Sequence, residues 1–293
     1  MNVPIWDLED IVRRALVEDI GSGDVTTDSL IPEDATGTGV VQLRQGGIIA
    51  GLDVLVLTFR LVDPNIKVTL FKRDGDAVNP GDVVARLEGP ARGLLKGERV
   101  ALNFIQRMSA IATATNQLVR AVEGLPVRII DTRKTTPGLR PLERYSVRAG
   151  GGRNHRYGLS DGVLIKDNHL EVLAQEGHGI TEAIRRARAA IPHTISIEVE
   201  VETLEQAREA AEAGADAILL DNMSPAQMRE AVTLIDGRAL TEASGGVTAD
   251  NIRSVAESGV DLISSGSLTH SIKAMDIGID FELATRSLPA GVA

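Results

Sequence analysis

The first regular pattern of hydrophobic positions lies close to the start of the chain and has helical spacing. Its members are Leu8, Ile11, Val12, Ala15 and Leu16. Side chains three and four residues apart share one face of an α-helix, so the pattern predicts an amphipathic helix over residues 7–19, with Asp7 as its N-cap. The same spacing, sustained for longer, predicts a second helix over residues 97–123.

Between these helices, over residues 36–95, the pattern changes to short apolar runs separated by Gly and Pro. Such runs are typical of strands joined by tight turns. We therefore expect an N-terminal α/β sandwich domain over residues 1–112, joined by the C-terminal segment 274–293. Residues 74–84 look like part of a biotinyl or lipoyl domain, but no modifiable lysine stands at a hairpin tip, which favours a structural sandwich over a carrier.

The rest of the chain, residues 113–273, alternates strand-like runs with amphipathic helices. The runs begin near Val127, Val163, Ile195, Ala217, Ala239 and Leu262. Consecutive βα units imply parallel strands. A complete eight-unit barrel needs roughly 200–250 residues, so we expect an incomplete βα barrel of about six or seven strands. Polar or Gly residues end nearly every run, as at a barrel's catalytic rim, and no Gly-x-Gly-x-x-Gly fingerprint supports a dinucleotide-binding sheet.

Composition excludes several classes of function. The 293 residues include no Cys, which removes disulfides, thiolate metal sites and cysteine nucleophiles. A net charge of −10 with 2% aromatic residues argues against a nucleic-acid partner. The best apolar run, residues 54–59, is too short to cross a membrane. The acidic first turn is unlike a signal or transit peptide, so we expect a cytoplasmic protein that binds no membrane.

Acidic side chains alternate along one predicted strand, residues 196–202. Glu198, Glu200 and Glu202 share the face opposite the intervening Ile and Val residues, and we expect them to point into the barrel. Buried carboxylates need cations or a metal nearby. Asp221, at the end of the next strand, could complete a magnesium site with Glu200. The alternative is an edge strand with a solvated acidic face.

Basic residues are concentrated over residues 133–156, which carry seven Lys or Arg, one His and one acidic residue, Glu143. This density favours a ligand with several negative charges. Arg140, Arg144 and Arg148 fit a solvated or dimer-facing loop equally well. Gly-rich segments at 242–248 and 264–270 follow the last two predicted strands, where βα barrels commonly bind phosphate. Arg99 lies in the first turn of the predicted long helix, where the helix dipole disfavours a cation.

Several of these segments together resemble the quinolinate phosphoribosyltransferase family, essentially from end to end. The resemblance rests on Thr-Arg-Lys-Thr-Thr-Pro-Gly at 132–138 and on residues 18–27, 150–156, 164–169, 198–200, 220–222 and 268–271. It implies transfer of phosphoribose from phosphoribosyl pyrophosphate to quinolinate. The products would be nicotinate mononucleotide, pyrophosphate and CO2, formed with Mg2+ in de novo NAD biosynthesis.

The resemblance also implies a role for individual side chains. Quinolinate would be held by Arg133, His155, Arg156 and Lys166, joined by Arg99 from the second subunit of a homodimer. Lys134 and Lys166 would contact phosphoribosyl pyrophosphate, and Glu200 and Asp221 would hold its ribose and Mg2+. The remaining expected substrate contacts, most of them to phosphate, are Thr132, Ser244, Gly245, Gly246, Ser265, Gly266, Ser267 and His270. Lys134, Glu200 and Asp221 are the expected catalytic residues.

Two other functions remain open on the sequence. A related phosphoribosyltransferase-like protein of molybdenum transport shares this fold, although the full set of quinolinate motifs argues against it. A non-catalytic carrier built on the sandwich of residues 36–95 is the second alternative.

Overall fold

The computed structural model describes residues 3–284, which form two compact units. The first holds residues 3–114, 136–151 and 271–284, and the second holds 115–135 and 152–270. The sequence prediction assigns 136–151 to the barrel domain, whereas the contacts group this segment with the first unit. The part of the expected C-terminal segment beyond residue 284 lies outside the described residues.

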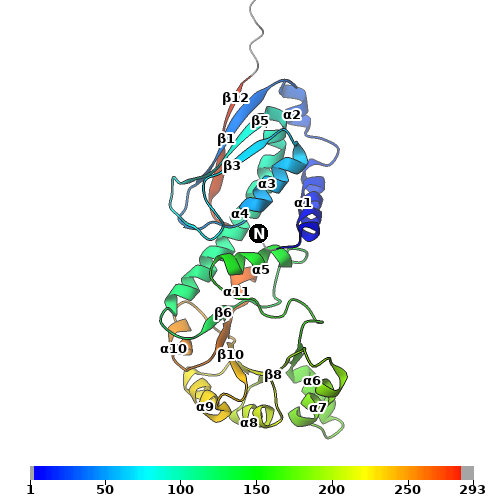
Figure 1. Ribbon diagram of the computed structural model, residues 1–293, viewed down its shortest axis with the longest axis vertical. Coiled ribbons are helices and arrows are strands. Elements are labelled where there is room, and N and C mark those ends of the chain that lie inside the picture. Colours follow the sequence, from blue (N-terminus) through cyan, green and yellow to red (C-terminus); the bar gives the residue numbers. More distant parts are fainter. Residues whose placement is uncertain (1–2, 285–293) are drawn as a thin grey trace, which may run out of the picture. The chain divides into compact units, whose positions relative to one another are not determined.

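The first unit is built on a four-stranded antiparallel sheet in the order β12-β1-β5-β3 (Figure 1). These strands are β1 (Thr36–Leu43), β3 (Lys67–Leu70), β5 (Val83–Pro90) and β12 (Ile277–Ala284). Two short strands of the same unit, β2 (Gly47–Ile48) and β4 (Ala77–Val78), form a separate antiparallel pair. Helices α3 (Leu52–Val62) and α4 (Ala91–Ala121) cover one face of the sheet, with Phe59 fully buried in the shared core.

The prediction of a β-rich segment over 36–95 missed helix α3. Its residues face two cores: Leu55 and Phe59 pack with the sheet, while Val54 and Leu57 pack with helix α1 (Ile5–Ile20). Because two cores bury most of its residues, α3 has only a narrow polar stripe, with Asp53 and Arg60 exposed, and it lies within a segment whose other apolar runs are strand-like.

Two helix starts also differ from the prediction. Helix α1 begins at Ile5 after Pro4, so Asp7 lies in its first turn and is not the N-cap. The long helix α4 begins at Ala91, so Arg99 lies beyond the first turn and is exposed. The argument from the helix dipole at Arg99 is therefore wrong, because that effect fades within one turn. Two short helices, α2 (Val25–Leu30) and α5 (Arg140–Ala149), complete the first unit.

The second unit is a six-stranded parallel sheet in the order β6-β11-β10-β9-β8-β7. Its strands are β6 (Arg128–Ile130), β7 (Val163–Ile165), β8 (Ile197–Val201), β9 (Ala217–Asp221), β10 (Leu240–Ser244) and β11 (Leu262–Ser264). All six lie where the pattern predicts them. The first strand pairs with the last, and β6 and β7 remain the two edges. This confirms the incomplete βα barrel, with six strands.

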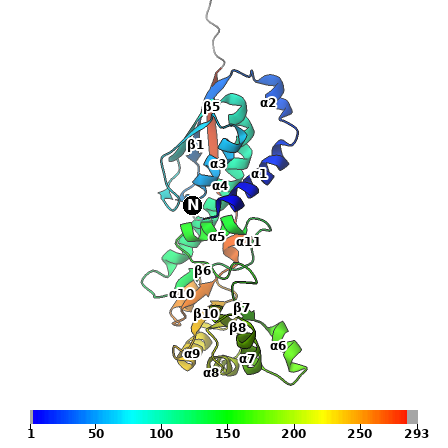
Figure 2. The ribbon, with the colours of Figure 1, turned by 45° about the vertical axis from the view of Figure 1, so that its right-hand side comes forward.

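Helices follow the strands of this unit in the expected alternation. They are α6 (Asp167–Ala174), α7 (Ile180–Ala190), α8 (Leu204–Glu212), α9 (Pro225–Ile235), α10 (Ile252–Ala256) and α11 (Ser267–His270). Helices α7, α8 and α9 lie on one side of the strands in both views (Figures 1 and 2). Helix α8 starts with Thr203 as N-cap, whose hydroxyl accepts the Gln206 N–H, and α9 starts in the same way at Ser224. Among the described residues, no helix has both the length and the apolar composition that a membrane crossing requires.

A buried ion pair anchors α5 within the first unit. Glu143 is 1% exposed and its Oε1 accepts hydrogen bonds from Arg107 Nε at 2.8 Å and Nη2 at 2.6 Å. Its Oε2 accepts the backbone N–H of Thr136 at 3.1 Å, and Arg107 also donates to the Thr136 hydroxyl. The ion pair therefore fixes the start of segment 136–151, which carries α5, to α4.

Replacing Glu143 with Ala should destabilise the protein by about 3–5 kcal/mol, because the substitution leaves a partly buried guanidinium and a backbone N–H without their acceptor. Chemical denaturation measures the change. Asp10→Ala, which removes an exposed i,i+4 partner of Arg14, is the matched control and should leave the unfolding midpoint nearly unchanged. Equal effects of the two substitutions would contradict the assignment of Glu143 as an anchor.

Candidate active site

A cavity of about 570 Å³ lies in the second unit, at the carboxyl ends of its parallel strands. Each strand supplies residues at or next to its end: Lys166 follows β7, Asp221 closes β9, and Ser244 closes β10. The lining side chains are Thr132, Arg133, Lys134, His155, Arg156, Leu164, Lys166, Glu200, Leu219, Asp221, Asn222, Glu242, Ser244, Gly245 and Ser264. This edge is where active sites of βα barrels lie.

Most of the expected site residues line this cavity. Those that do are Thr132, Arg133, Lys134, His155, Arg156, Lys166, Glu200, Asp221, Ser244 and Gly245. Gly246, Ser265, Gly266, Ser267 and His270 belong to the same unit but are not among the lining residues. Arg99 belongs to the first unit. The sequence analysis did not select Leu164, Leu219, Asn222, Glu242 or Ser264. Of these, only Glu242 has an ionisable side chain, and its place at the end of a predicted strand was the available signal.

The acidic side of the cavity comes from β8 and β9. The Glu200 carboxylate forms an ion pair with Lys166 Nζ. Burial and the neighbouring charge of Glu200 raise the pKa of Asp221 above its ordinary value, and Asn222 Nδ2 donates to Asp221 Oδ2 at 2.7 Å. Two carboxylates that repel each other and face a cavity are suited to binding a cation or a developing positive charge.

Only part of the predicted acidic stripe on β8 faces inward. Glu198 is buried and Glu200 half-buried, as the alternation predicts, whereas Glu202 is exposed. The reason is that β8 ends at Val201, and the backbone N–H of Glu202 already donates to the Gln206 side chain at the start of α8. The prediction that Glu202 points into the barrel is therefore wrong.

The basic side of the cavity contains Arg133, His155 and Arg156. Arg133 and Arg156 both line the cavity, and burial and the charge of Arg133 lower the pKa of Arg156. Arg156 Nη1 also donates to the carbonyl of Gly162 at 2.8 Å. Cations placed side by side in this way favour an anionic ligand between them.

The segment that carries His155 and Arg156 is held by a fully buried carboxylate, Asp131, directly after β6. Its Oδ1 accepts the His155 backbone N–H at 2.8 Å, and its Oδ2 accepts Asn154 Nδ2 at 2.6 Å. The segment is thereby tied to the strand end that also leads to Arg133 and Lys134.

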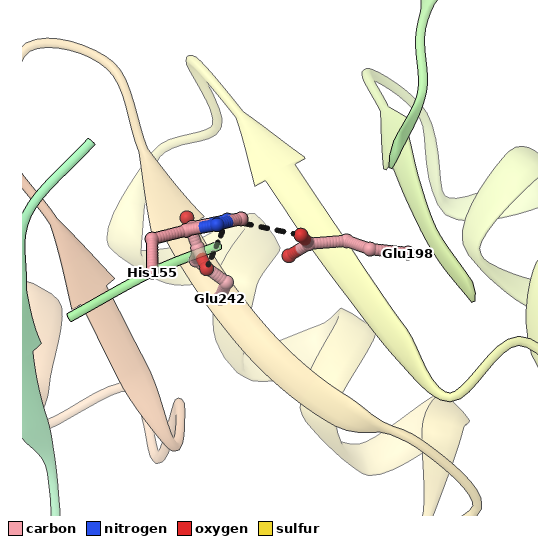
Figure 3. A group of neighbouring side chains, drawn as sticks. All are labelled: His155, Glu198 and Glu242. Atoms are coloured by element: carbon pink, nitrogen blue, oxygen red, sulfur yellow. Dashed lines mark ion pairs between the residues drawn. The ribbon is translucent and has the colours of Figure 1, made fainter. Parts of the chain in front are cut away.

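The imidazole of His155 faces two carboxyl groups from different strands (Figure 3). Its Nε2 lies 3.0 Å from Glu198 Oε2 on β8 and 3.6 Å from Glu242 Oε2 on β10. Burial lowers the pKa of His155, but the hydrogen bond to Glu198 and the charge of Glu242 outweigh burial and leave the pKa raised. On the other side of the ring, Nδ1 accepts the Arg156 backbone N–H at 2.7 Å, which directs the ring proton to Nε2.

Two Gly-containing loops follow β10 and β11. Gly245 and Gly246 have φ of +86° and +61°, which L side chains rarely adopt, and a Cβ on Gly245 would overlap the Asn222 side chain. At Gly266, a Cβ would come within 2.9 Å of Lys134 Cδ and 3.0 Å of His270 Cδ2. The Thr269 hydroxyl donates to the Lys134 carbonyl at 2.7 Å. The loop after β11 therefore packs directly against the segment that bears Lys134.

The basic run at 133–156 separates into different places in the structure. Arg133, Lys134, His155 and Arg156 line the cavity. Arg140, Arg144 and Arg148 lie on helix α5 in the first unit, not on a loop, and are not among the lining residues.

Family models cover nearly the whole chain. The model described as quinolinate phosphoribosyl transferase, C-terminal domain, matches residues 111–280, and the model for the N-terminal domain matches residues 24–109.

Among curated proteins, a probable nicotinate-nucleotide pyrophosphorylase [carboxylating] of Bacillus subtilis is 47% identical over 96% of both chains. A chloroplastic nicotinate-nucleotide pyrophosphorylase [carboxylating] of Oryza sativa is 42% identical over 96% of this chain and 80% of its own. The crystal structure of NadC from Streptococcus pyogenes matches with a TM-score of 0.92 and 39% identity, over 98% of this chain and 100% of that one.

Proposed function

The chain belongs to the quinolinate phosphoribosyltransferase family, the decarboxylating phosphoribosyltransferases of NAD biosynthesis, and we propose that the cavity of its second unit converts quinolinate and phosphoribosyl pyrophosphate to nicotinate mononucleotide, pyrophosphate and CO2. The observation that carries this proposal is the division of one cavity into a cationic side with Arg133 and Arg156 and an acidic side with Glu200 and Asp221. A dianionic pyridine ring fits the first side, and a ribose that gains positive charge fits the second.

Quinolinate binds on the cationic side in this proposal. Its two carboxylates are held by Arg133, His155, Arg156 and Lys166. Burial and the charge of Arg133 lower the pKa of Arg156, which supports the assignment because an anion bound at this side of the cavity would offset the repulsion between the two cations. Each guanidinium group is planar and can donate two parallel N–H hydrogen bonds to the two oxygens of a carboxylate.

Phosphoribosyl pyrophosphate occupies the rest of the cavity. Its diphosphate is contacted by Lys134 and Lys166, and Thr132 lines the same end. The two Gly-containing loops bind the 5′-phosphate, through Ser244, Gly245, Gly246, Ser265, Gly266, Ser267 and His270. Left-handed Gly residues with exposed backbone, and the contact of Gly266 with both Lys134 and His270, support this placement.

The donor set formed by Glu200 and Asp221 fits Mg2+. Carboxylate oxygens together with phosphate oxygens and water are the ligands that this hard cation prefers. Burial and the charge of Glu200 raise the pKa of Asp221 although Lys166 and Lys134 act in the opposite direction, which supports the assignment because a bound cation would stabilise both carboxylates. When bound, Mg2+ would neutralise charge on the departing diphosphate.

The protein's own residues provide electrostatic catalysis in this reaction. Glu200 and Asp221 lie where they stabilise positive charge that grows on the ribose as the bond to pyrophosphate breaks, while Lys134 stabilises the leaving group. The pyridine nitrogen of quinolinate attacks the ribose directly, so no covalent intermediate with the enzyme is needed. When the neighbouring carboxylate departs as CO2, the electron pair of the broken bond stays on the ring carbon, where the adjacent quaternised nitrogen stabilises it. A proton from solvent then adds to this carbon and completes nicotinate mononucleotide, while the protein orients and shields the ring.

The active unit in this proposal is a homodimer in which Arg99 of one protomer reaches quinolinate in the other. Arg99 is exposed on α4, as a residue that serves a second subunit should be in an isolated chain. Helices α1 and α2 of the first unit expose large apolar side chains, among them Trp6 at 80% and Val25 at 85%, which a second copy would cover. The cytoplasm stays a prediction, since one curated relative is named as chloroplastic.

The test is release of labelled CO2 from carboxyl-labelled quinolinate, with phosphoribosyl pyrophosphate and Mg2+ present or omitted one at a time. We expect release that requires all three. No release from a folded dimer would contradict the proposal. Mass spectrometry of the intact chain distinguishes the carrier alternative, which requires a biotinyl or lipoyl adduct.

A further inference from the structure

Two carboxyl groups compete for one imidazole nitrogen below the active-site cavity. Glu198 and Glu242 both approach Nε2 of His155, and the three ligating atoms lie within 4.8 Å of one another. Glu198 is 8% exposed and Glu242 is 1% exposed. His155 and Glu242 line both the active-site cavity and a second cavity of about 240 Å³ that Glu198 also borders. Glu242 therefore lies in the floor beneath the quinolinate-binding side.

The net charge of the cluster formed by His155, Glu198 and Glu242 depends on how many protons the three side chains hold. The imidazole brings at most one positive charge, so two ionised carboxylates would leave at least one negative charge buried with them. Glu198 already accepts the Nε2–H bond at 3.0 Å, whereas Glu242 stands at 3.6 Å, beyond hydrogen-bond distance. Glu242 Oε1 is buried with no hydrogen-bond partner, so a charge on this carboxyl would be poorly solvated.

The groups around Glu242 favour its protonated form. In register with it stand Leu219 on β9 and Leu262 on β11, both apolar. The facing polar groups are Glu198 on β8, Ser264 on β11 and His155. Burial first, and then the charge of Glu198, raise the pKa of Glu242 to about 8, against the opposing attraction of His155 and a hydrogen bond with Ser264. Arg128, Arg153 and Arg156 border the second cavity. Arg128 and Arg153 are exposed, and the half-buried Arg156 interacts electrostatically with Glu198, so this cation offsets the charge of Glu198 and not that of Glu242.

We propose that Glu242 works as a neutral carboxylic acid whose hydroxyl donates a hydrogen bond to Glu198. This bond fixes Glu198 as the acceptor that orients His155 toward quinolinate. The carboxyl oxygens of Glu198 and Glu242 that face His155 lie within 4.8 Å of each other. In this proposal the chain of hydrogen bonds runs from the Glu242 hydroxyl to the Glu198 carboxylate and from there to the His155 Nε2–H. Glu242 is a positioning residue, since it acts through His155. The role of His155 in binding quinolinate rests on the proposed function.

The proposal predicts a pH dependence whose sign follows from the charge of Glu242. Because the pKa of Glu242 is raised to about 8, the carboxyl is largely protonated at pH 7 and adds little charge to the site. As the pH rises through about 8, Glu242 ionises, repels Glu198 and places a negative charge below a dianionic substrate. The KM for quinolinate should therefore rise about tenfold between pH 7 and pH 9, with a smaller change in kcat.

Glu242→Gln is the decisive variant, because its amide donates to Glu198 as the protonated acid does and cannot ionise. We expect a quinolinate KM within about twofold of the parent at pH 7 and loss of the Glu242-dependent rise up to pH 9. Glu242→Ala, which lacks the donor, should raise KM at both pH values, and a thermal melt checks that it folds. A Glu242→Gln variant with the parent's pH profile, or with a tenfold higher KM at pH 7, would overturn the proposal.

A second measurement does not depend on turnover. In ¹⁵N-histidine-labelled protein without substrate, the ring nitrogens of His155 should show a step in shift with its midpoint at the Glu242 pKa of about 8 in the parent. That step should be missing from Glu242→Gln, where only the titration of the imidazole itself is left; His155→Gln identifies the signals. Absence of that change in the parent would overturn the proposal. The proposal would also be overturned if the parent protein copurified with one equivalent of a metal ion that is absent from Glu242→Gln. If the protein fails to release CO2 but shows the Glu242-dependent shift, the proposed function fails and the role of Glu242 stands.

Discussion

Glu200→Gln is expected to lower kcat by about 10²–10³-fold while quinolinate binding stays within a few-fold of the parent. The Glu200 carboxylate is paired with Lys166 and acts electrostatically on Asp221 at the acidic side of the cavity. In the proposed reaction its charge matters most when the ribose becomes positive. An interaction that strengthens only in the transition state changes kcat more than binding. Steady-state kinetics and calorimetric titration with quinolinate measure the two quantities.

The same strand provides a matched control for this substitution. Glu202 lies two residues further on, is exposed, and is not among the residues that line the cavity. Glu202→Gln makes the same chemical change and should leave both kcat and quinolinate binding unaltered. An unchanged kcat in Glu200→Gln, or equal losses in both variants, would show that Glu200 does not have the role proposed for it.

The parallel-strand unit could be predicted from sequence because its two signals agree. Each strand is a short apolar run, and each ends in polar or Gly residues, as β9 does at Asp221 and β10 at Ser244. Carboxyl ends of parallel strands meet at one edge, so listing the strand ends also lists much of the cavity. Lys166, Glu200 and Asp221 were predicted by this reasoning, and all three line the cavity.

The errors arise where a residue's environment depends on segments distant in sequence. Helix α3 was missed because two separate cores bury most of its residues and leave only a narrow polar stripe. The basic run at 133–156 could not show that α5 carries Arg140, Arg144 and Arg148 into the other unit, since charge density carries no information on direction. In the sequence, Glu242 belongs to a Gly-rich segment. Its contact with His155 beside Glu198 depends on β8 and residue 155, which are distant in sequence.

Arg99→Ala is expected to raise the KM for quinolinate by about 100-fold and to leave the homodimer intact. Arg99 is exposed on α4 of the first unit, and in the proposal it binds a quinolinate carboxylate in the partner's cavity. Loss of one partner of a desolvated, hydrogen-bonded charge pair costs about 2–5 kcal/mol. Arg120→Ala, which removes another exposed arginine of the same helix, should not change KM. Normal turnover of Arg99→Ala at low quinolinate would contradict the cross-subunit assignment.

Mixing two inactive variants tests the sharing of the site directly. If Arg99 and Glu200 of one site come from different protomers, a heterodimer of Arg99→Ala and Glu200→Gln contains one site with both residues intact and one site with neither. Random reassortment of equal amounts makes half of all dimers heterodimers, so the mixture should recover about a quarter of the parent activity at low quinolinate. If both residues of a site come from the same protomer, every site keeps one defect and mixing restores nothing. The recovered fraction thus separates a shared site from a self-contained one, even where each single variant only loses activity.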